Sequence, residues 1–178
     1  MIFGEAKIEG ARIVESEQLA DERGFFARTW DADEFAEQGL AGGLAQCSIS
    51  YNPAPGTLRG LHYQVPPHEE AKLIRCTAGA LYDVAVDLRP KSPTFKSWFG
   101  VELTAVNRLA LYVPEGCAHG FLTLTDDTEV LYLISAPHVP EAARGVRWDD
   151  PGLGIKWPAE VVVINERDRT YPDFDARS

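Results

Sequence analysis

The sequence predicts an all-β fold, a double-sheet jelly roll with one or two short helices. Among 178 residues, 15 Gly and 12 Pro separate short runs rich in Val, Ile, Leu, Tyr and Phe. Short strands at close, regular spacing with turn residues between them are typical of sandwiches and barrels. A jelly roll is favoured because its interior can hold a ligand.

Six apolar runs are the clearest expected strands. Several alternate between apolar and polar residues, which is the period of a strand with one buried face. In chain order the runs are 72–77, 80–88, 98–103, 109–113, 120–124 and 129–135.

Only the segment 31–38 has clear helix signals. Asp31 can cap its first turn, Glu34 follows three residues later, and Gly39 can end it. A weaker helical turn is expected near 140–143. Because the chain shows no repeat, low-complexity tract or linker, residues 1–178 are expected to form a single domain.

Composition excludes several classes of protein. Lys and Arg total 17 against 27 Asp and Glu, a formal charge of −10, which argues against a nucleic-acid-binding protein. No apolar run approaches the roughly 20 residues of a membrane span, and the first residues lack the features of a secretion signal. Three scattered cysteines, Cys47, Cys76 and Cys117, favour a reducing compartment and hence the cytoplasm.

Polar side chains are concentrated in a few strand-like segments, above all 56–64 (Gly-Thr-Leu-Arg-Gly-Leu-His-Tyr-Gln). On a regular strand His62 shares a face with Gly60, and Arg59 lies on the opposite face. A histidine beside a glycine leaves room for something other than a side chain. Lys72 similarly shares its expected face with Ile74.

The run Pro114-Glu115-Gly116-Cys117-Ala118-His119 has the form Pro-x-Gly-x-x-His and resembles one half of the cupin signature. In the other half a glutamate stands seven residues before a glycine, but Lys72 stands seven residues before Gly79. The two remaining ligand positions fall on Pro66 and His68. Since an ammonium group repels a divalent ion, the resemblance implies a cupin without a metal site and disfavours a metal-dependent oxygenase.

A closer resemblance extends from about residue 20 to residue 172. The matching stretches are 21–26, 56–64, 72–76, 83–89, 113–121, 148–151 and 155–158. In these the chain resembles the dTDP-4-dehydrorhamnose 3,5-epimerase family, most specifically around His62. The resemblance implies a cupin-type double-stranded jelly roll that forms a homodimer and works with neither a metal nor a dissociable cofactor.

The same resemblance implies a nucleotide-linked 4-keto-6-deoxy sugar as substrate. The reaction converts dTDP-4-dehydro-6-deoxyglucose to dTDP-4-dehydrorhamnose by epimerisation at C3 and C5. The hydrogens on C3 and C5 are next to the C4 ketone, so loss of either one as a proton gives an enolate. Inversion needs a base on one face, a partner for the enolate oxygen, and an acid on the opposite face.

Four residues match the family's catalytic groups. His62 matches the base, and an imidazole titrates near neutral pH, where a general base works well. Asp168 matches the carboxylate that orients this histidine. Lys72 matches the group that stabilises the enolate oxygen, an effect on the order of 3 kcal/mol, although a lysine can also protect an edge strand. Tyr132 matches the acid, although a strand tyrosine can simply pack.

Five further residues match positions that bind the substrate. Arg23 and Arg59 match residues that hold the diphosphate, for which guanidinium groups are well suited. Gln46 and Ser48 are expected to reach the nucleotide. His119 is expected either to touch the sugar or to shape the site.

Three further residues have expected positions. Asp83 can orient His119 as a polar pair inside the barrel. His138 stands where the family often has an aromatic residue that stacks on the base, so the nucleobase stays open. His68 and His138 are expected to be exposed.

Two alternatives remain. One is a single-centre epimerase, acting only at C3 or only at C5 of a related sugar. The other is a non-catalytic cupin that binds a sugar nucleotide. The combined set of His62, Asp168, Lys72 and Tyr132 favours catalysis, because a binding protein needs no base paired with an acid.

Overall fold

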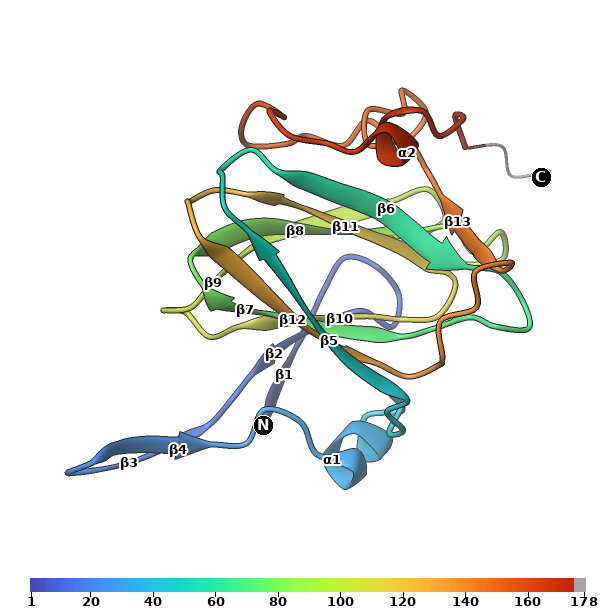
Figure 1. Ribbon diagram of the computed structural model, residues 1–178. Coiled ribbons are helices and arrows are strands. Elements are labelled where there is room, and N and C mark those ends of the chain that lie inside the picture. Colours follow the sequence, from blue (N-terminus) through green and yellow to red (C-terminus); the bar gives the residue numbers. More distant parts are fainter. Residues whose placement is uncertain (175–178) are drawn as a thin grey trace.

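The computed structural model describes residues 1–174, which form two packed antiparallel sheets and a projecting hairpin (Figure 1). The first sheet contains β1 (Ile2–Glu5), β2 (Arg12–Glu15), β5 (Gln46–Asn52), β7 (Lys72–Ala78), β10 (Ala110–Val113) and β12 (Thr128–Ile134). The second contains β6 (Leu58–Gln64), β8 (Ala80–Asp87), β9 (Trp98–Thr104), β11 (Cys117–Thr123) and β13 (Ala143–Gly145). The hairpin is β3 (Gln18–Asp21) and β4 (Gly24–Ala27), and the helices are α1 (Ala32–Glu37) and α2 (Glu166–Arg169).

The strand order is that of a jelly roll. It runs β1-β2-β10-β7-β12-β5 in the first sheet and β13-β6-β11-β8-β9 in the second, with every strand pair antiparallel. The predicted all-β jelly roll with short helices is therefore confirmed. The six predicted strands correspond to β7 through β12. No helix among residues 1–174 has the length and apolar character needed to cross a membrane.

The helix predictions had mixed outcomes. The helix α1 is present, and the Asp31 side chain caps it by accepting hydrogen bonds from the amides of Asp33 and Glu34. The helical turn expected near 140–143 is present as a single turn, in which the Ala143 amide donates to the Val139 carbonyl four residues earlier, and the turn leads directly into β13. The one-turn helix α2 was not anticipated.

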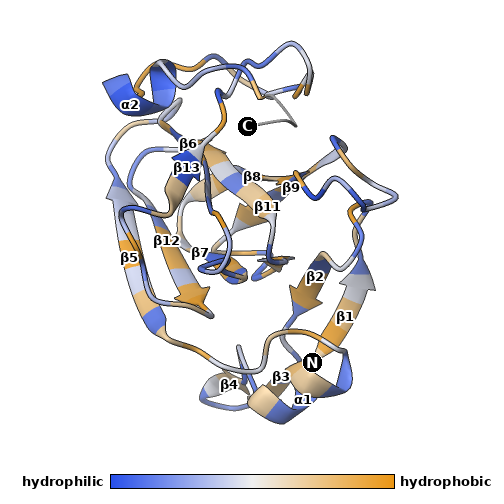
Figure 2. Cartoon of the chain, turned by 90° about the vertical axis from the view of Figure 1, so that its right-hand side faces the viewer, coloured by the Kyte–Doolittle hydropathy of each residue, from blue (hydrophilic) through white to orange (hydrophobic). Residues whose placement is uncertain are grey.

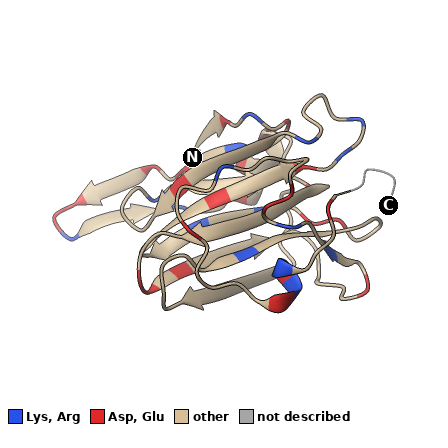
Figure 3. Cartoon of the chain, turned by 90° about the horizontal axis from the view of Figure 1, so that it is seen from above, with Lys and Arg blue, Asp and Glu red and all other residues tan. Residues whose placement is uncertain are grey.

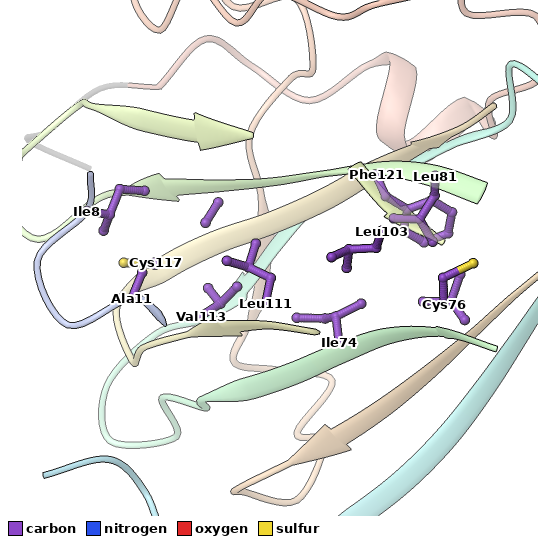
Figure 4. Packing of buried hydrophobic residues seen from close by; sticks show 12 residues of the cluster. Ile8, Ala11, Ile74, Cys76, Leu81, Leu103, Leu111, Val113, Cys117 and Phe121 are labelled. Atoms are coloured by element: carbon purple, nitrogen blue, oxygen red, sulfur yellow. The ribbon is translucent and has the colours of Figure 1, made fainter. Parts of the chain in front are cut away.

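Apolar residues of both sheets form the core between them (Figure 4). Ile74, Leu111 and Val130 come from the first sheet, and they meet Leu103 and Phe121 of the second. Each is almost completely buried, and full burial of such a side chain contributes about 1.5–3 kcal/mol.

Smaller clusters cover part of each sheet's outer face. On the first sheet, Phe35 of α1 packs edge-on against Tyr112, with ring centroids 5.9 Å apart. On the second sheet, Val146 and Leu153 of the C-terminal segment pack over Leu61. Acidic and basic residues are interspersed over the strands and loops seen from above (Figure 3).

Asp87 organises the corner that follows β8. Its buried carboxylate accepts hydrogen bonds from the Arg89 guanidinium and from the hydroxyls of Ser92 and Thr94. Burial would raise the pKa of this carboxyl, but these hydrogen bonds outweigh burial and lower the pKa to about 2. The charged form therefore stabilises the folded protein.

We expect Asp87→Asn to lower the free energy of unfolding at neutral pH by about 2 kcal/mol. Because the folded pKa lies below the unfolded value, this contribution is fully present above about pH 5 and is lost as the pH falls toward 2. Urea titrations of both proteins over this range measure the difference. Substituting the exposed Asp126 by Asn provides the control, and a difference for Asp87→Asn that does not change with pH would contradict the assignment.

Candidate active site

A cavity of about 460 Å³ lies between the two sheets near the free edge of β5. In the view of Figure 2, the strands β5 and β12 lie at the left of the molecule, and the strands β6 and β13 lie at the top. The cavity is lined by Gln46, Ser48, Ile49, Ser50, Arg59, His62, Tyr63, Gln64, Glu70, Lys72, Tyr132, Ile134, His138, Ala143, Arg144, Asn165, Arg167 and Asp168.

Cross-strand register brings the residues of one wall together. Tyr132 of β12 lies opposite Ser48 of β5, and the next row places Ile134 between Gln46 and Lys72. Directly opposite residues of an antiparallel pair project from the same face of a sheet. Four predicted site residues, Gln46, Ser48, Lys72 and Tyr132, therefore face the same cavity.

The opposite wall depends on an irregularity between β6 and β11. His62 lies opposite His119, and Arg59 lies opposite Phe121, so a three-residue step on β6 matches a two-residue step on β11. This β-bulge brings Arg59 to the same side as His62. The expectation that the two residues lie on opposite faces was wrong, because it assumed a regular strand.

Gly60 is required at this irregularity. Its φ is +119°, and a Cβ added there would lie 2.5 Å from Gly120 Cα and 2.8 Å from the His119 carbonyl oxygen. The expectation that this glycine leaves room for a ligand was wrong, because the backbone of β11 occupies the space. The close approach fixes β6 against β11 two residues before His62.

His62 and Asp168 form a close polar pair in the cavity. His62 Nε2 lies 2.7 Å from Asp168 Oδ1, and the Gly60 amide donates to Asp168 Oδ2 over 2.9 Å. Since a carboxylate only accepts hydrogen bonds, Nε2 carries the hydrogen and Nδ1 keeps a free lone pair. The imidazole is 34% exposed, so it can meet a ligand in the cavity.

The helix α2 brings Asp168 to β6, and Figure 1 shows it lying over this strand. The Asn165 side chain caps α2 by accepting from the amide of Asp168. Asp168 is completely buried, which would raise the pKa of its carboxyl. The hydrogen bonds from His62 and Gly60 outweigh burial and hold that pKa below its ordinary value, so the carboxylate stays charged.

His119 forms a second pair with Asp83, as the sequence suggested. Its Nε2 lies 2.7 Å from Asp83 Oδ1, and both residues are buried. Burial raises the pKa of Asp83, although His119 acts in the opposite direction. The ring of Tyr132 stands edge-on to His119, with centroids 6.0 Å apart. His119 itself does not line the cavity, which it meets through Tyr132.

Tyr132 is suited to remain a neutral phenol. Its hydroxyl lies 3.4 Å from Ser50 Oγ, and burial strongly raises the pKa of the phenol. The side chain therefore carries its proton across the physiological pH range and can donate it to a ligand.

Lys72 lies on a strand inside the first sheet, between β10 and β12, so it does not protect a free edge. Its ammonium group forms an ion pair with Glu70, with Nζ 2.5 Å from Oε1 and both side chains 9% exposed. Sequence reasoning missed Glu70, which stands before the strand in a segment without a regular pattern.

Three arginines of the cavity are not hydrogen-bonded to a carboxylate among the described residues. Arg59 donates to Asn52 Oδ1 over 2.7 Å and to a backbone carbonyl, both neutral acceptors. Arg144 and Arg167 were missed by the sequence analysis. Arg144 donates to backbone carbonyls, and Arg167 Nε lies 3.8 Å from Asp168 Oδ1. Because β13 has three residues and the adjacent Ala143 and Arg144 both line the cavity, alternation gives no signal for Arg144.

Arg23 does not reach the cavity of its own chain. It lies in the turn of the β3–β4 hairpin, 84% exposed and paired with Asp21. His138 is exposed as expected and lines the cavity rim, where its amide donates to Gln46. His68 is exposed and lies outside the cavity lining. Within residues 1–174, no group of three His, Cys, Asp or Glu side chains is placed to hold a metal ion.

Comparison with known proteins identifies the family. The family model for dTDP-4-dehydrorhamnose 3,5-epimerase matches residues 5–176. The chain belongs to this family. The predicted family membership is thereby confirmed, and the chain is an enzyme of the isomerase class.

Individual relatives agree with this assignment. The chain is 41% identical over 175 residues to a dTDP-4-dehydrorhamnose 3,5-epimerase of Sinorhizobium fredii, covering 98% of this chain and 90% of the relative. The crystal structure of the Bacillus anthracis epimerase, with TDP and PPi bound, matches with a TM-score of 0.93 at 38% identity, covering 97% and 99% of the two chains. A dTDP-4-dehydrorhamnose 3-epimerase of Streptomyces niveus is 40% identical over 163 residues, covering 91% of this chain and 78% of the relative.

We expect the His62 ring to carry its hydrogen on Nε2, and Asp168→Asn to move the hydrogen to Nδ1. In the variant the amide oxygen accepts from the Gly60 amide, so the amide NH₂ faces Nε2 and requires a lone pair there. Nitrogen-15 NMR of the imidazole distinguishes the two tautomers. The His119 signals serve as an internal control, and an unchanged His62 tautomer would contradict the described hydrogen bonds.

Proposed function

We propose that the chain converts dTDP-4-dehydro-6-deoxyglucose to dTDP-4-dehydrorhamnose by epimerisation at C3 and C5. The observation that carries this proposal is the cavity in which a His–carboxylate pair, an ammonium group and a neutral phenol converge. A sugar-nucleotide substrate agrees with the TDP in the Bacillus anthracis structure. A protein that only bound its ligand would have no need of a base, an oxyanion partner and an acid in one cavity.

His62 acts as the base in the proposed mechanism. Its Nδ1 lone pair takes the proton from C3 or C5 of the sugar, which leaves an enolate. The ring then carries a positive charge, which the charged Asp168 stabilises across the Nε2 hydrogen bond. Asp168 therefore orients the base and does not itself take the proton.

Lys72 and Tyr132 complete the reaction. The ammonium group of Lys72 donates to the C4 oxygen as negative charge develops there, an effect of a few kcal/mol in a pocket that excludes water. Tyr132 supplies a proton to the carbanionic carbon, and reprotonation from the face opposite His62 inverts the centre. The raised pKa of this phenol keeps the donated proton available.

Arg59 is proposed to hold the diphosphate, because neutral acceptors orient its guanidinium without cancelling its charge. Gln46 and Ser48 are proposed to contact the nucleoside from the wall formed by β5. We assign His119 a shaping role through its contact with Tyr132.

A homodimer accounts for Arg23. The hairpin that carries it exposes Leu19 (70%) and Phe26 (67%), and β5 exposes Ile49 (63%) and Tyr51 (55%) beside the cavity. Exposed apolar groups of this kind mark interaction surfaces. We propose that a second copy covers the β5 surface and that its hairpin brings Arg23 to the diphosphate.

A single-centre epimerase is the second candidate. The Streptomyces niveus 3-epimerase is nearly as similar in sequence as the 3,5-epimerase from Sinorhizobium fredii, at 40% against 41% identity. The two activities use the same base and oxyanion chemistry, and they differ in whether C5 also reaches His62. The number of exchanged carbons decides between them.

We further propose that residues 1–178 act as one domain and that the protein works in the cytoplasm. One cavity receives residues from a span of the chain that reaches from position 46 to position 168. The three cysteines are free thiols, as suits a reducing compartment.

Incubation with dTDP-4-keto-6-deoxyglucose in heavy water, followed by NMR, tests the reaction. We expect deuterium at both C3 and C5. Incorporation at one carbon would establish the single-centre alternative, and binding without incorporation would establish a non-catalytic protein.

His62→Ala is expected to remove exchange at both carbons with the fold intact, whereas Tyr132→Phe impairs inversion more than abstraction. Equal loss of both steps would refute the role of Tyr132.

Mixing two inactive variants tests the homodimer. We expect Arg23→Ala and His62→Ala to be inactive separately and to recover activity after their subunits exchange, because one site of the mixed dimer then has both residues. Analytical ultracentrifugation verifies the dimer. If Arg23 served its own chain, the mixture would stay inactive.

A further inference from the structure

Glu70 lines the cavity and has no part in the mechanism above. Its carboxylate is in direct contact with the catalytic ammonium group, Oε1 to Lys72 Nζ 2.5 Å, and both side chains are only 9% exposed. An ion pair held away from water is weakly screened, so Glu70 removes much of the attraction that Lys72 would exert on a distant anion.

The other cations of the cavity are held differently. Arg59 and Arg144 donate to neutral oxygens, and the 62% exposed Arg167 stands 3.8 Å from its nearest carboxylate. Among the described residues that line the cavity, Lys72 is thus the one cation in hydrogen-bonding contact with a carboxylate. The positive charge of Arg59 is therefore not balanced by a neighbouring carboxylate, whereas the charge of Lys72 is balanced by Glu70.

This difference between Arg59 and Lys72 matters because the substrate carries charged diphosphate oxygens as well as a neutral ketone oxygen. The diphosphate is a multiply charged anion, and a lysine ammonium binds phosphate well as a point charge. Without a counter-ion, Lys72 would offer the diphosphate a competing site, and a sugar nucleotide bound there would leave its ketone away from the base.

We propose that Glu70 is a positioning residue that reserves Lys72 for the sugar by repelling the diphosphate from the lysine. The inference rests on the proposed function, since it assigns Lys72 to the ketone oxygen. An ammonium group has three N–H donors, and Glu70 occupies one of them. The others remain for the C4 oxygen, which needs a short-range donor and not a long-range attraction.

The test removes the charge and keeps the shape. In Glu70→Gln, the amide oxygen can still accept from Lys72, but the cavity loses one negative charge. We expect this variant to bind inorganic pyrophosphate about tenfold more tightly in calorimetry. For the sugar nucleotide, kcat and KM are expected to fall together, because a competing unproductive orientation lowers both and leaves kcat/KM nearly unchanged.

Matched variants isolate the effect. Glu69→Gln removes the adjacent carboxylate, which lines a different cavity beside Leu88 and Phe174, and should leave pyrophosphate binding unchanged. Glu70→Ser removes the charge without retaining a carbonyl acceptor and should also tighten pyrophosphate binding. In a Lys72→Gln background, the Glu70→Gln effect should disappear, as a double-mutant cycle measures.

Three results would overturn the proposal. They are unchanged pyrophosphate binding in folded Glu70→Gln and Glu70→Ser, an equal gain in the Lys72→Gln background, and a raised KM with a lowered kcat, which is the signature of a merely structural role. Pyrophosphate binding is measured without turnover. A failure of the proposed epimerisation, seen as no deuterium exchange by the unmodified protein, is therefore distinguishable from a failure of this inference.

Discussion

The arrangement of the cavity depends on one buried carboxylate. Asp168 accepts a hydrogen bond from the His62 ring and another from the Gly60 amide, so the same group fixes the side chain and the strand that carries it. The helix that presents Asp168 has four residues, too few to persist without outside contacts. The contacts of Asp168 therefore order the C-terminal segment, β6 and the imidazole together. The position of the His62 ring depends on this tertiary contact and not on β6 alone.

Two similar His–carboxylate pairs lie on neighbouring strands in different environments. His62 is 34% exposed and its partner is held charged, whereas His119 is 5% exposed and burial raises the pKa of its partner. Asp83 Oδ2 also has no hydrogen-bond partner within the described structure. The first pair is open to a ligand in the cavity, while the second is buried beside the ring of Tyr132. Environments that push apart the pKa values of like groups commonly divide their roles.

The sequence predicted the jelly roll from local pattern, and it predicted seven of the residues that line the cavity from the family resemblance. The Gly- and Pro-bounded runs correspond to β7 through β12, and the stretches that match the family located His62 and Lys72. The errors have physical causes. A regular period of two placed Arg59 on the wrong face, since alternation does not reveal a bulge that is set by the partner strand. Glu70 was missed because it stands before β7 in a segment without a regular pattern. The helix α2 was missed because Asp168 is held by Gly60 and His62, which are distant in sequence.

The close approach at Gly60 has a consequence for engineering. One wall of the cavity is locked by backbone packed against backbone, and even a methyl group at that position would displace its neighbour. The opposite wall stands on β5, an edge strand with one bonded neighbour, where side chains can change without moving a buried main chain. Libraries that aim at new nucleotides should therefore diversify positions 46 and 48, and leave the glycine of β6 untouched.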